Sequence, residues 1–117
     1  MSMVLLLDDE PEMATLVEMC LRDVRVTRAA NFAEAVAAAR KERPQAMLLD
    51  IALNEEEDGL ALLPRLRQEP ALSNVPIIGF SVHGSRRREA LDMGVEGFVA
   101  KPFKAASLRE VLQPYLG

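Results

Sequence analysis

Two stretches, VLLLDD at residues 4–9 and AMLLD at residues 46–50, decide the fold. Each is a short, continuous run of aliphatic side chains that ends in aspartate, with no alternation of apolar and polar residues. Strands that are buried on both faces have this pattern, and they occur in parallel sheets that carry helices on both sides. The two stretches therefore predict an α/β domain whose acidic residues lie where strands end.

The rest of the chain alternates between similar apolar runs and segments of helical period. We expect strands at residues 3–7, 24–27, 46–49, 76–80 and 97–100. We expect helices from Pro11, from Asn31 to about Arg43, and over residues 60–68, 84–92 and 107–116. The first helix is predicted to bury a face made of Met13, Leu16, Val17, Cys20 and Leu21. Five strands alternating with five helices predict a three-layer (βα)5 domain with a parallel five-stranded sheet.

Length and composition fit one domain with one aliphatic interior. The chain has 117 residues, half of them hydrophobic, and a formal net charge of −4. This charge argues against direct nucleic-acid binding, and no apolar run approaches the roughly 20 residues that a membrane span needs. The start of the chain does not read as a signal peptide. Cys20 is the single cysteine, which excludes an intrachain disulfide, so we expect a reducing, cytoplasmic setting.

Polar side chains follow four of the predicted strands. Asp8 and Asp9 end the first strand, Asp50 the third, Ser81 the fourth and Lys101 the fifth. Because the carboxyl ends of parallel strands meet at one edge of the sheet, we expect these side chains to share a crevice.

The chemistry of these side chains suits phosphoryl transfer to an aspartate. Two carboxylates about 4 Å apart repel by about 4 kcal/mol at an effective dielectric constant near 20. A divalent cation removes this repulsion, and carboxylate oxygens with room for water suit Mg²⁺. Lys101 adds a positive charge and Ser81 a hydroxyl donor. An acceptor carboxylate beside these groups needs positioning and charge stabilisation from the protein.

Five motifs together resemble those of response-regulator receiver domains of two-component signalling. They are LLLDDEPE at 5–12, MLLDI at 47–51, DGLALL at 58–63, IIGFSV at 77–82 and GFVAKPF at 97–103. The resemblance covers essentially the whole chain and implies a flavodoxin-like fold with strand order 2-1-3-4-5, taken from the family. We expect one free-standing receiver domain over residues 1–117.

The resemblance assigns an acceptor and a metal site. Asp50 would accept a phosphoryl group from a sensor histidine kinase or a phosphotransfer protein. Asp50 and Asp9 would bind Mg²⁺ directly and Asp8 mainly through water, and the backbone carbonyl of Ala52 would complete the protein ligands.

The resemblance also assigns switch residues. Ser81 and Lys101 would contact the phosphoryl group, and the peptide bond between Lys101 and Pro102 resembles the family's cis bond. Phe98 occupies the aromatic position whose rotation accompanies activation. The output would be a change in the protein-binding face at residues 84–116, read by a downstream protein; a homodimer is left open.

Four features depart from the family pattern. Val82 is larger than the usual residue after the hydroxyl, and the stretch from Ser81 to Lys101 is about two residues short. The loop at residues 54–58, NEEED, is acidic, and the segment between Asp50 and Gly59 is one residue longer than is usual in the family. His83 and Ala52 occupy two positions that tune dephosphorylation. We expect these departures to slow the entry and the loss of a phosphoryl group.

Three functions remain in competition at this stage. The phosphorylation switch leads, followed by a phosphorylation-independent adaptor (a pseudo-receiver). A Mg²⁺-dependent phosphatase with an aspartate nucleophile ranks last, because Ala52 stands where its second carboxylate is usual. We therefore expect no enzyme activity beyond self-catalysed phosphorylation and dephosphorylation. Residues 86–88, RRR, fit a solvated helix face, an acidic partner or pairing with the loop at 54–58.

Overall fold

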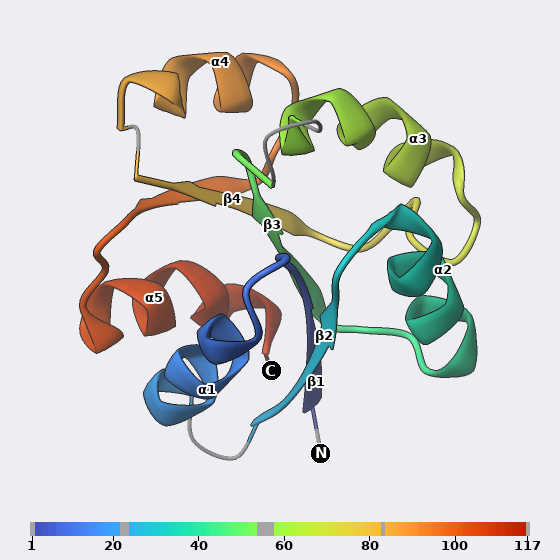
Figure 1. Ribbon diagram of the computed structural model, residues 1–117, viewed down its shortest axis with the longest axis horizontal. Coiled ribbons are helices and arrows are strands. Elements are labelled where there is room, and N and C mark those ends of the chain that lie inside the picture. The colour runs from blue at the N-terminus through green and yellow to red at the C-terminus, as the bar shows by residue number, and fades with distance from the viewer. Residues whose placement is uncertain (1, 22–23, 54–57, 83, 117) are drawn as a thin grey trace.

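The computed structural model describes residues 2–21, 24–53, 58–82 and 84–116, and these confirm the predicted alternation of strands and helices. One parallel sheet has the order β2-β1-β3-β4-β5, as expected (Figure 1). Its strands are β1 (Ser2–Leu7), β2 (Val24–Ala29), β3 (Ala46–Asp50), β4 (Ile77–Ser81) and β5 (Gly97–Ala100). The chain winds toward β2 after β1 and toward β4 after β3, so the connections after these two central strands diverge and open a crevice.

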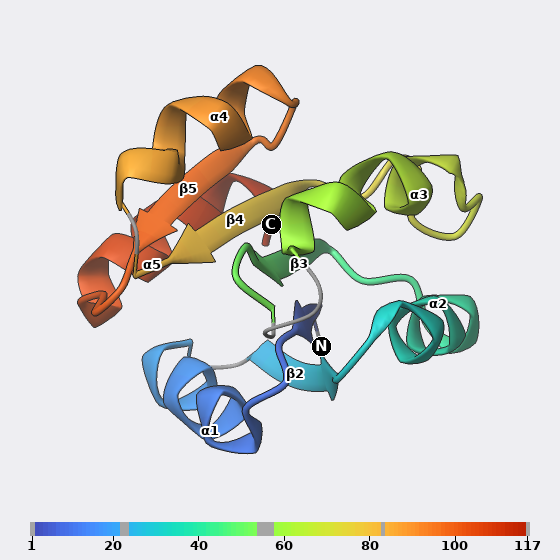
Figure 2. The same ribbon diagram turned by 45° about the horizontal axis from the view of Figure 1, so that its top comes forward.

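Helices cover both faces of the sheet. They are α1 (Pro11–Cys20), α2 (Phe32–Lys41), α3 (Leu63–Gln68), α4 (Arg87–Asp92) and α5 (Ala105–Leu112), with 3₁₀ turns at η1 (Gly59–Leu62), η2 (Gly84–Arg86) and η3 (Gln113–Tyr115). The helices α1 and α5 lie on one face, and α2, α3 and α4 lie on the other (Figures 1 and 2). Asn31 caps α2 by accepting a hydrogen bond from the Glu34 N–H at 2.9 Å, as the sequence predicts.

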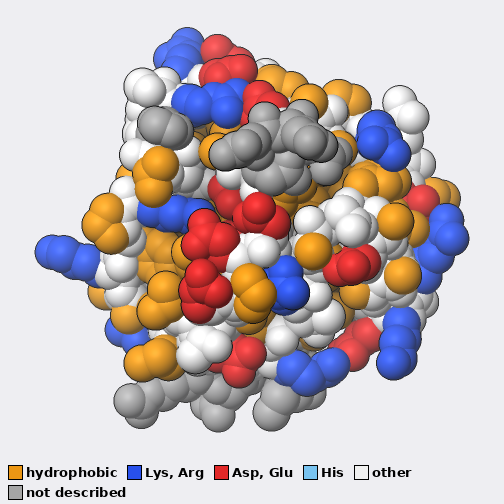
Figure 3. Space-filling model, viewed as in Figure 1, with side chains coloured by type: hydrophobic (Ala, Val, Ile, Leu, Met, Phe, Trp, Pro, Cys, Tyr) orange, Lys and Arg blue, Asp and Glu red, His pale blue; other side chains and the backbone are white. Residues whose placement is uncertain are grey.

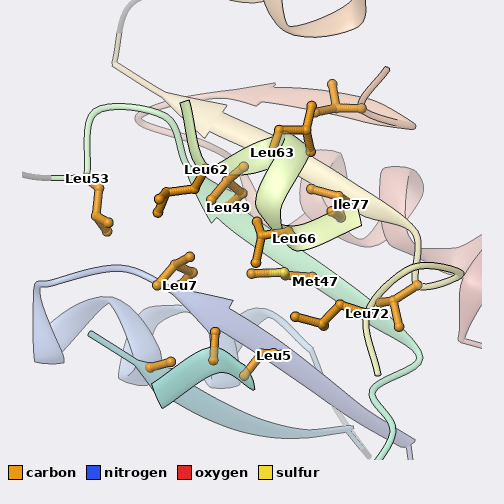
Figure 4. Packing of buried hydrophobic residues seen from close by; sticks show 14 of the residues in the cluster. Leu5, Leu7, Met47, Leu49, Leu53, Leu62, Leu63, Leu66, Leu72 and Ile77 are labelled. Carbon is orange, nitrogen blue, oxygen red and sulfur yellow. The ribbon is translucent and has the colours of Figure 1, made fainter. Parts of the chain in front are cut away.

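Alternation along the strands divides the core into two clusters. Leu5 and Leu7 of β1 pack with residues of α2 and α3, whereas Val4 and Leu6 pack with residues of α1 and α5. Figure 4 shows the leucines of η1 and α3 converging on Met47 and Leu49 of β3. Burying one such leucine stabilises the fold by about 2 kcal/mol, so the two clusters hold the central strands firmly.

Several expected details differ. Leu16 was expected on the buried face of α1 but is 48% exposed, because Met13, Val17 and Leu21, spaced four residues apart, form the inward line. Cys20 is partly buried at the flank of the second cluster. The last helix begins two residues earlier than expected, at Ala105, and the segment expected as one helix over 84–92 divides into η2 and α4.

Within the described ranges, no helix is long and apolar enough to cross a membrane.

Candidate functional site

The carboxyl edge of the sheet carries the polar side chains that the sequence singled out. Asp50 and Ser81 are the last residues of β3 and β4, while Asp8 and Lys101 directly follow β1 and β5. The strand register places three of them close together: Asp50 pairs with Phe80, which precedes Ser81, and Ser81 pairs with Ala100, which precedes Lys101. Asp8, Asp50 and Ser81 are buried, with 0%, 4% and 1% of their surfaces exposed. Figure 3 shows acidic side chains gathered over the turn between β1 and α1, with basic side chains beside them.

Lys101 connects the two buried carboxylates. Its ammonium Nζ lies 3.7 Å from Asp8 Oδ2 and 3.7 Å from Asp50 Oδ1. Both distances exceed those of ordinary hydrogen bonds, so the contacts are electrostatic. The same Nζ lies 4.3 Å from the centre of the Phe80 ring. The Lys101 ammonium thus contacts the face of the Phe80 ring and lies near two carboxylates.

Asp8 is held by one of its carboxylate oxygens. Its Oδ1 accepts a hydrogen bond from the Glu10 N–H at 2.8 Å, and the Arg28 guanidinium donates to its backbone carbonyl at 3.0 Å. Its Oδ2 is buried and, among the described residues, has no hydrogen-bond partner. Burial raises the pKa of Asp8, against the lowering effects of the Glu10 N–H and Lys101. A buried carboxylate oxygen in this condition favours a bound cation.

Asp50 has a shifted pKa for the same main reason. Burial raises the pKa of Asp50 to about 7, although Lys101 opposes the shift, and the charge of Asp8 raises it further. The backbone N–H of Ala52 donates to the Asp50 carboxylate. The role expected for the Ala52 carbonyl stays a prediction.

Glu10 was absent from the predicted site. Asp8, Asp9 and Glu10 each offer a carboxylate oxygen, and these oxygens lie within 4.8 Å of one another. Asp9 and Glu10 are exposed, so they form the outer part of a potential cation site whose inner part is Asp8. Glu10 directly precedes Pro11 and makes no capping hydrogen bond with its side chain, which leaves its carboxylate available.

Gly59 fits against the backbone of the candidate acceptor. Its N–H donates to the Ile51 carbonyl at 2.6 Å, and a Cβ at this position would lie 1.9 Å from the Asp50 carbonyl oxygen. Any larger residue would therefore displace the end of β3.

The pair of Asp58 and Arg86 links the loop that follows β3 to the start of α4. The Arg86 guanidinium donates to both carboxylate oxygens of Asp58, at 2.9 and 2.7 Å, and also to Glu89 at 2.9 Å. The hydrogen bonds from Arg86 hold the pKa of Asp58 below its ordinary value. For Arg86 the structure confirms the expected pairing with the acidic loop, through Asp58. Arg88 is exposed and pairs with Asp92 on its own helix. Residues 54–57 and His83 lie outside the described residues.

The other predicted positions are placed as follows. The peptide bond between Lys101 and Pro102 is cis, as expected. Val82 is 61% exposed and borders an apolar hollow of about 440 Å³ beside Lys101, lined also by residues of α1. Phe98 is buried in the first core cluster beside Gly79. Its rotation stays a prediction.

The sequence matches the response regulator receiver domain over residues 4–113. The chain belongs to this family. The receiver domain is 36% identical over 111 residues to the probable transcriptional regulatory protein TcrX of Mycobacterium tuberculosis. That match covers 93% of this chain and 46% of TcrX, so the chain spans about half the length of this relative.

Solved structures agree with the family and the fold. The receiver domain of the sensor histidine kinase PA1611 from Pseudomonas aeruginosa, which has a magnesium ion coordinated in its active-site cleft, superposes with a TM-score of 0.80 at 33% identity, covering 99% of this chain and 98% of that one. The chemotaxis protein CheY4 of Vibrio cholerae superposes with a TM-score of 0.83 at 27% identity, covering 99% of both chains. The flavodoxin-like fold and the receiver family, both expected from the motifs, are confirmed.

Proposed function

We propose that this receiver domain is a phosphorylation-dependent switch in which Asp50 accepts a phosphoryl group in the presence of Mg²⁺. The donor is a phosphohistidine of a sensor kinase or of a phosphotransfer protein, and the setting is the cytoplasm. The observation that carries the proposal is the placement of one ammonium, that of Lys101, 3.7 Å from each of two buried carboxylates. With Asp9 at the rim the cluster carries two more negative than positive charges, and a divalent cation supplies the balance.

The residues at the edge of the sheet fit Mg²⁺. Hard carboxylate oxygens are the ligands this ion prefers, and Asp8, Asp9 and Asp50 are the side chains we assign to it, with the Ala52 carbonyl. Asp8 Oδ2, which accepts no hydrogen bond from the described residues, supports this assignment, and exposed Asp9 and Glu10 leave the outer side open to water. The PA1611 receiver domain holds magnesium in its own cleft.

The chain's own residues supply the nucleophile and the charge stabilisation. A carboxylate oxygen of Asp50 attacks phosphorus, forming an O–P bond as the N–P bond of the donor breaks and the imidazole leaves. The Lys101 ammonium and the Ser81 hydroxyl then contact the phosphoryl oxygens. Bound Mg²⁺ supplies positive charge that lowers the repulsion between the acceptor and the incoming phosphoryl group. Because burial raises the pKa of Asp50 to about 7, the ion also favours the ionised acceptor.

The output of the switch is a change in the face formed by α4, β5 and α5. Phe98 is buried in β5 close to α4, and Ser81 lies at the end of the neighbouring strand. A hydroxyl drawn toward the phosphoryl group would alter the packing next to Phe98, which a downstream protein would read. We propose no turnover of an external substrate, because the position two residues after the acceptor is Ala52, which carries no acid or base.

Phosphorylation can be tested by mass spectrometry of the intact chain after treatment with acetyl phosphate and Mg²⁺. We expect wild type and Asp58→Asn to gain one phosphoryl group, and Asp50→Asn to gain none. Asp58 is a matched control because it lies in the loop that follows Asp50 but is already paired with Arg86. Failure of wild type to gain mass would reject the proposal and favour the phosphorylation-independent adaptor. Equal phosphorylation of Asp50→Asn would place the acceptor elsewhere.

A further inference from the structure

We propose that Phe80 is a positioning residue for Lys101: the face of its ring holds the ammonium between the two carboxylates, ready to meet the incoming phosphoryl group. The inference rests on the proposed phosphorylation of Asp50. It is carried by the contact between Lys101 Nζ and the ring, whose centre lies 4.3 Å away.

Strand register explains how the ring reaches this position. Phe80 lies next to the end of β4 and pairs with Asp50 on one side and with Val99 on the other. Its side chain packs in the cluster on the α1 and α5 face, and the alternation along β4 points the side chain of the next residue, Ser81, to the other face. The ring is 1% exposed, so it forms a fixed wall between the strand that carries the acceptor and the strand that leads to Lys101.

Electrostatics explain why an aromatic wall matters here. The face of an aromatic ring attracts a cation, and the attraction grows when water is scarce. The Lys101 side chain is 12% exposed, so little water competes. An aliphatic side chain at position 80 would offer no such attraction. The Lys101 ammonium would then move to within hydrogen-bond distance of one of the two carboxylates.

The contact between Lys101 and the Phe80 ring also affects the carboxylate oxygens of the site. Nζ stays 3.7 Å from each carboxylate, beyond ordinary hydrogen-bond distance, so Lys101 partly offsets the charge of both groups without donating a close hydrogen bond to either. One of these oxygens, Asp8 Oδ2, has no hydrogen-bond partner in the described part of the chain. The ammonium is also already placed near the point where charge develops during transfer, and such preorganisation accelerates a reaction.

The first test weakens the ring's negative face while keeping its shape. Phenylalanine at position 80 is replaced, site-specifically, by its monofluoro, difluoro and pentafluoro analogues, and the rate of phosphorylation by acetyl phosphate with Mg²⁺ is measured. We expect the rate to fall stepwise, by about fivefold across the series, which is the range of a partly desolvated cation–π contact. In a Lys101→Met background the slower residual rate should not respond to fluorination.

Two outcomes of this series would overturn the inference. One is a rate that does not change with fluorination in the wild-type background. The other is an equal decline in the Lys101→Met background, which would show that the ring acts through packing. If the unsubstituted protein takes up no phosphoryl group at all, the proposed function fails and the second test decides the contact.

The second test needs no phosphorylation. Lys41, Lys101 and Lys104 are the three lysines, so protein with ¹³C-labelled lysine gives three resolvable Cε signals. Protons held over a ring face are shifted upfield, and we expect this shift for Lys101 in wild type and in Phe80→Tyr, but not in Phe80→Leu. An unshifted Lys101 signal in wild type would overturn the inference.

Discussion

Asp50 and Asp58 lie eight positions apart in one segment, yet their surroundings shift the pKa values of the two carboxyl groups in opposite directions. Asp50 is buried, shares the ammonium of Lys101 with Asp8, and has a pKa raised to about 7. Asp58 sits at the surface, receives two hydrogen bonds from one arginine, and has a lowered pKa. The fold satisfies one carboxylate and leaves the other short of positive charge.

This difference separates a structural carboxylate from one suited to chemistry. A carboxylate that is fully hydrogen-bonded gains nothing further from a cation or a phosphoryl group, whereas a buried one with too little positive charge gains much from either. The end of β3 therefore carries an acceptor that is costly to ionise until a ligand arrives, and the loop that follows it carries a stabilising surface bridge.

The largest expected effect concerns Mg²⁺ binding and pH. Below about pH 7 the cation must displace a proton from Asp50, so the apparent association constant should fall roughly tenfold per pH unit between pH 7 and pH 5. Calorimetric titration with Mg²⁺ at pH 8, 6 and 5 measures this slope. Asp58→Asn should keep the slope and Asp50→Asn should flatten it. A wild-type affinity that is constant from pH 8 to pH 5 would contradict the account.

The next effect is on stability without Mg²⁺. Because the folded-state pKa of Asp50 is raised, ionising this group destabilises the fold. The destabilisation is absent below the ordinary pKa near 4, grows as the pH rises, and is complete above about pH 7. Asp50→Asn removes this cost and leaves Lys101 with one carboxylate. We expect the variant to be more stable than wild type at pH 8 by about 1–3 kcal/mol, with little difference at pH 4. Urea unfolding at both pH values measures this, and a less stable variant at pH 8 would refute it.

A smaller effect of opposite sign is expected at Asp58. Its pKa is lowered, so the bridge to Arg86 stabilises the fold above the ordinary pKa and is lost as pH falls below it. Asp58→Asn should cost about 1 kcal/mol at pH 7, and less in 1 M salt. Asp92→Asn is the matched control, because its pairing with Arg88 is largely exposed and should contribute little. Equal losses in the two variants would show that the forked geometry of the bridge adds nothing.

The smallest effect concerns Glu10. Its carboxylate lies close to those of Asp8 and Asp9 but is exposed, so Glu10→Gln should weaken Mg²⁺ binding by about two- to threefold, chiefly through the loss of nearby negative charge. Glu12→Gln, in the first turn of α1, serves as the control for a general change in charge. If both variants weaken binding equally, Glu10 has no special place at the site.

Much of the fold and the site could be predicted because strand ends in a parallel sheet converge on one edge. Asp8, Asp50, Ser81 and Lys101 follow apolar runs directly, so their placement needed the strands alone. The unbroken runs also marked the central strands, since both of their faces are covered.

Contacts that depend on side-chain direction could not be predicted in this way. The ring of Phe80 beneath Lys101 depends on strand register and on the path of the chain after β5, neither of which a single sequence specifies. The bridge from Arg86 to Asp58 depends on how η2 approaches the loop after β3, and the sequence left three interpretations of residues 86–88 open. Leu16 was misplaced because helical period defines a broad stripe, while contact with the sheet uses one line within it.

Asp50 has a raised pKa until a cation is bound, and this claim is central. Measuring the pKa of Asp50 tests it most directly. Titration of the carboxyl carbons by ¹³C NMR, with and without Mg²⁺ and with Asp50→Asn to assign the signal, measures this pKa. We predict a midpoint for Asp50 near 7 without Mg²⁺ and a clearly lower one with it, while Asp58 titrates below its ordinary range in both conditions. A midpoint for Asp50 near the ordinary value of about 4, unmoved by Mg²⁺, would contradict the account.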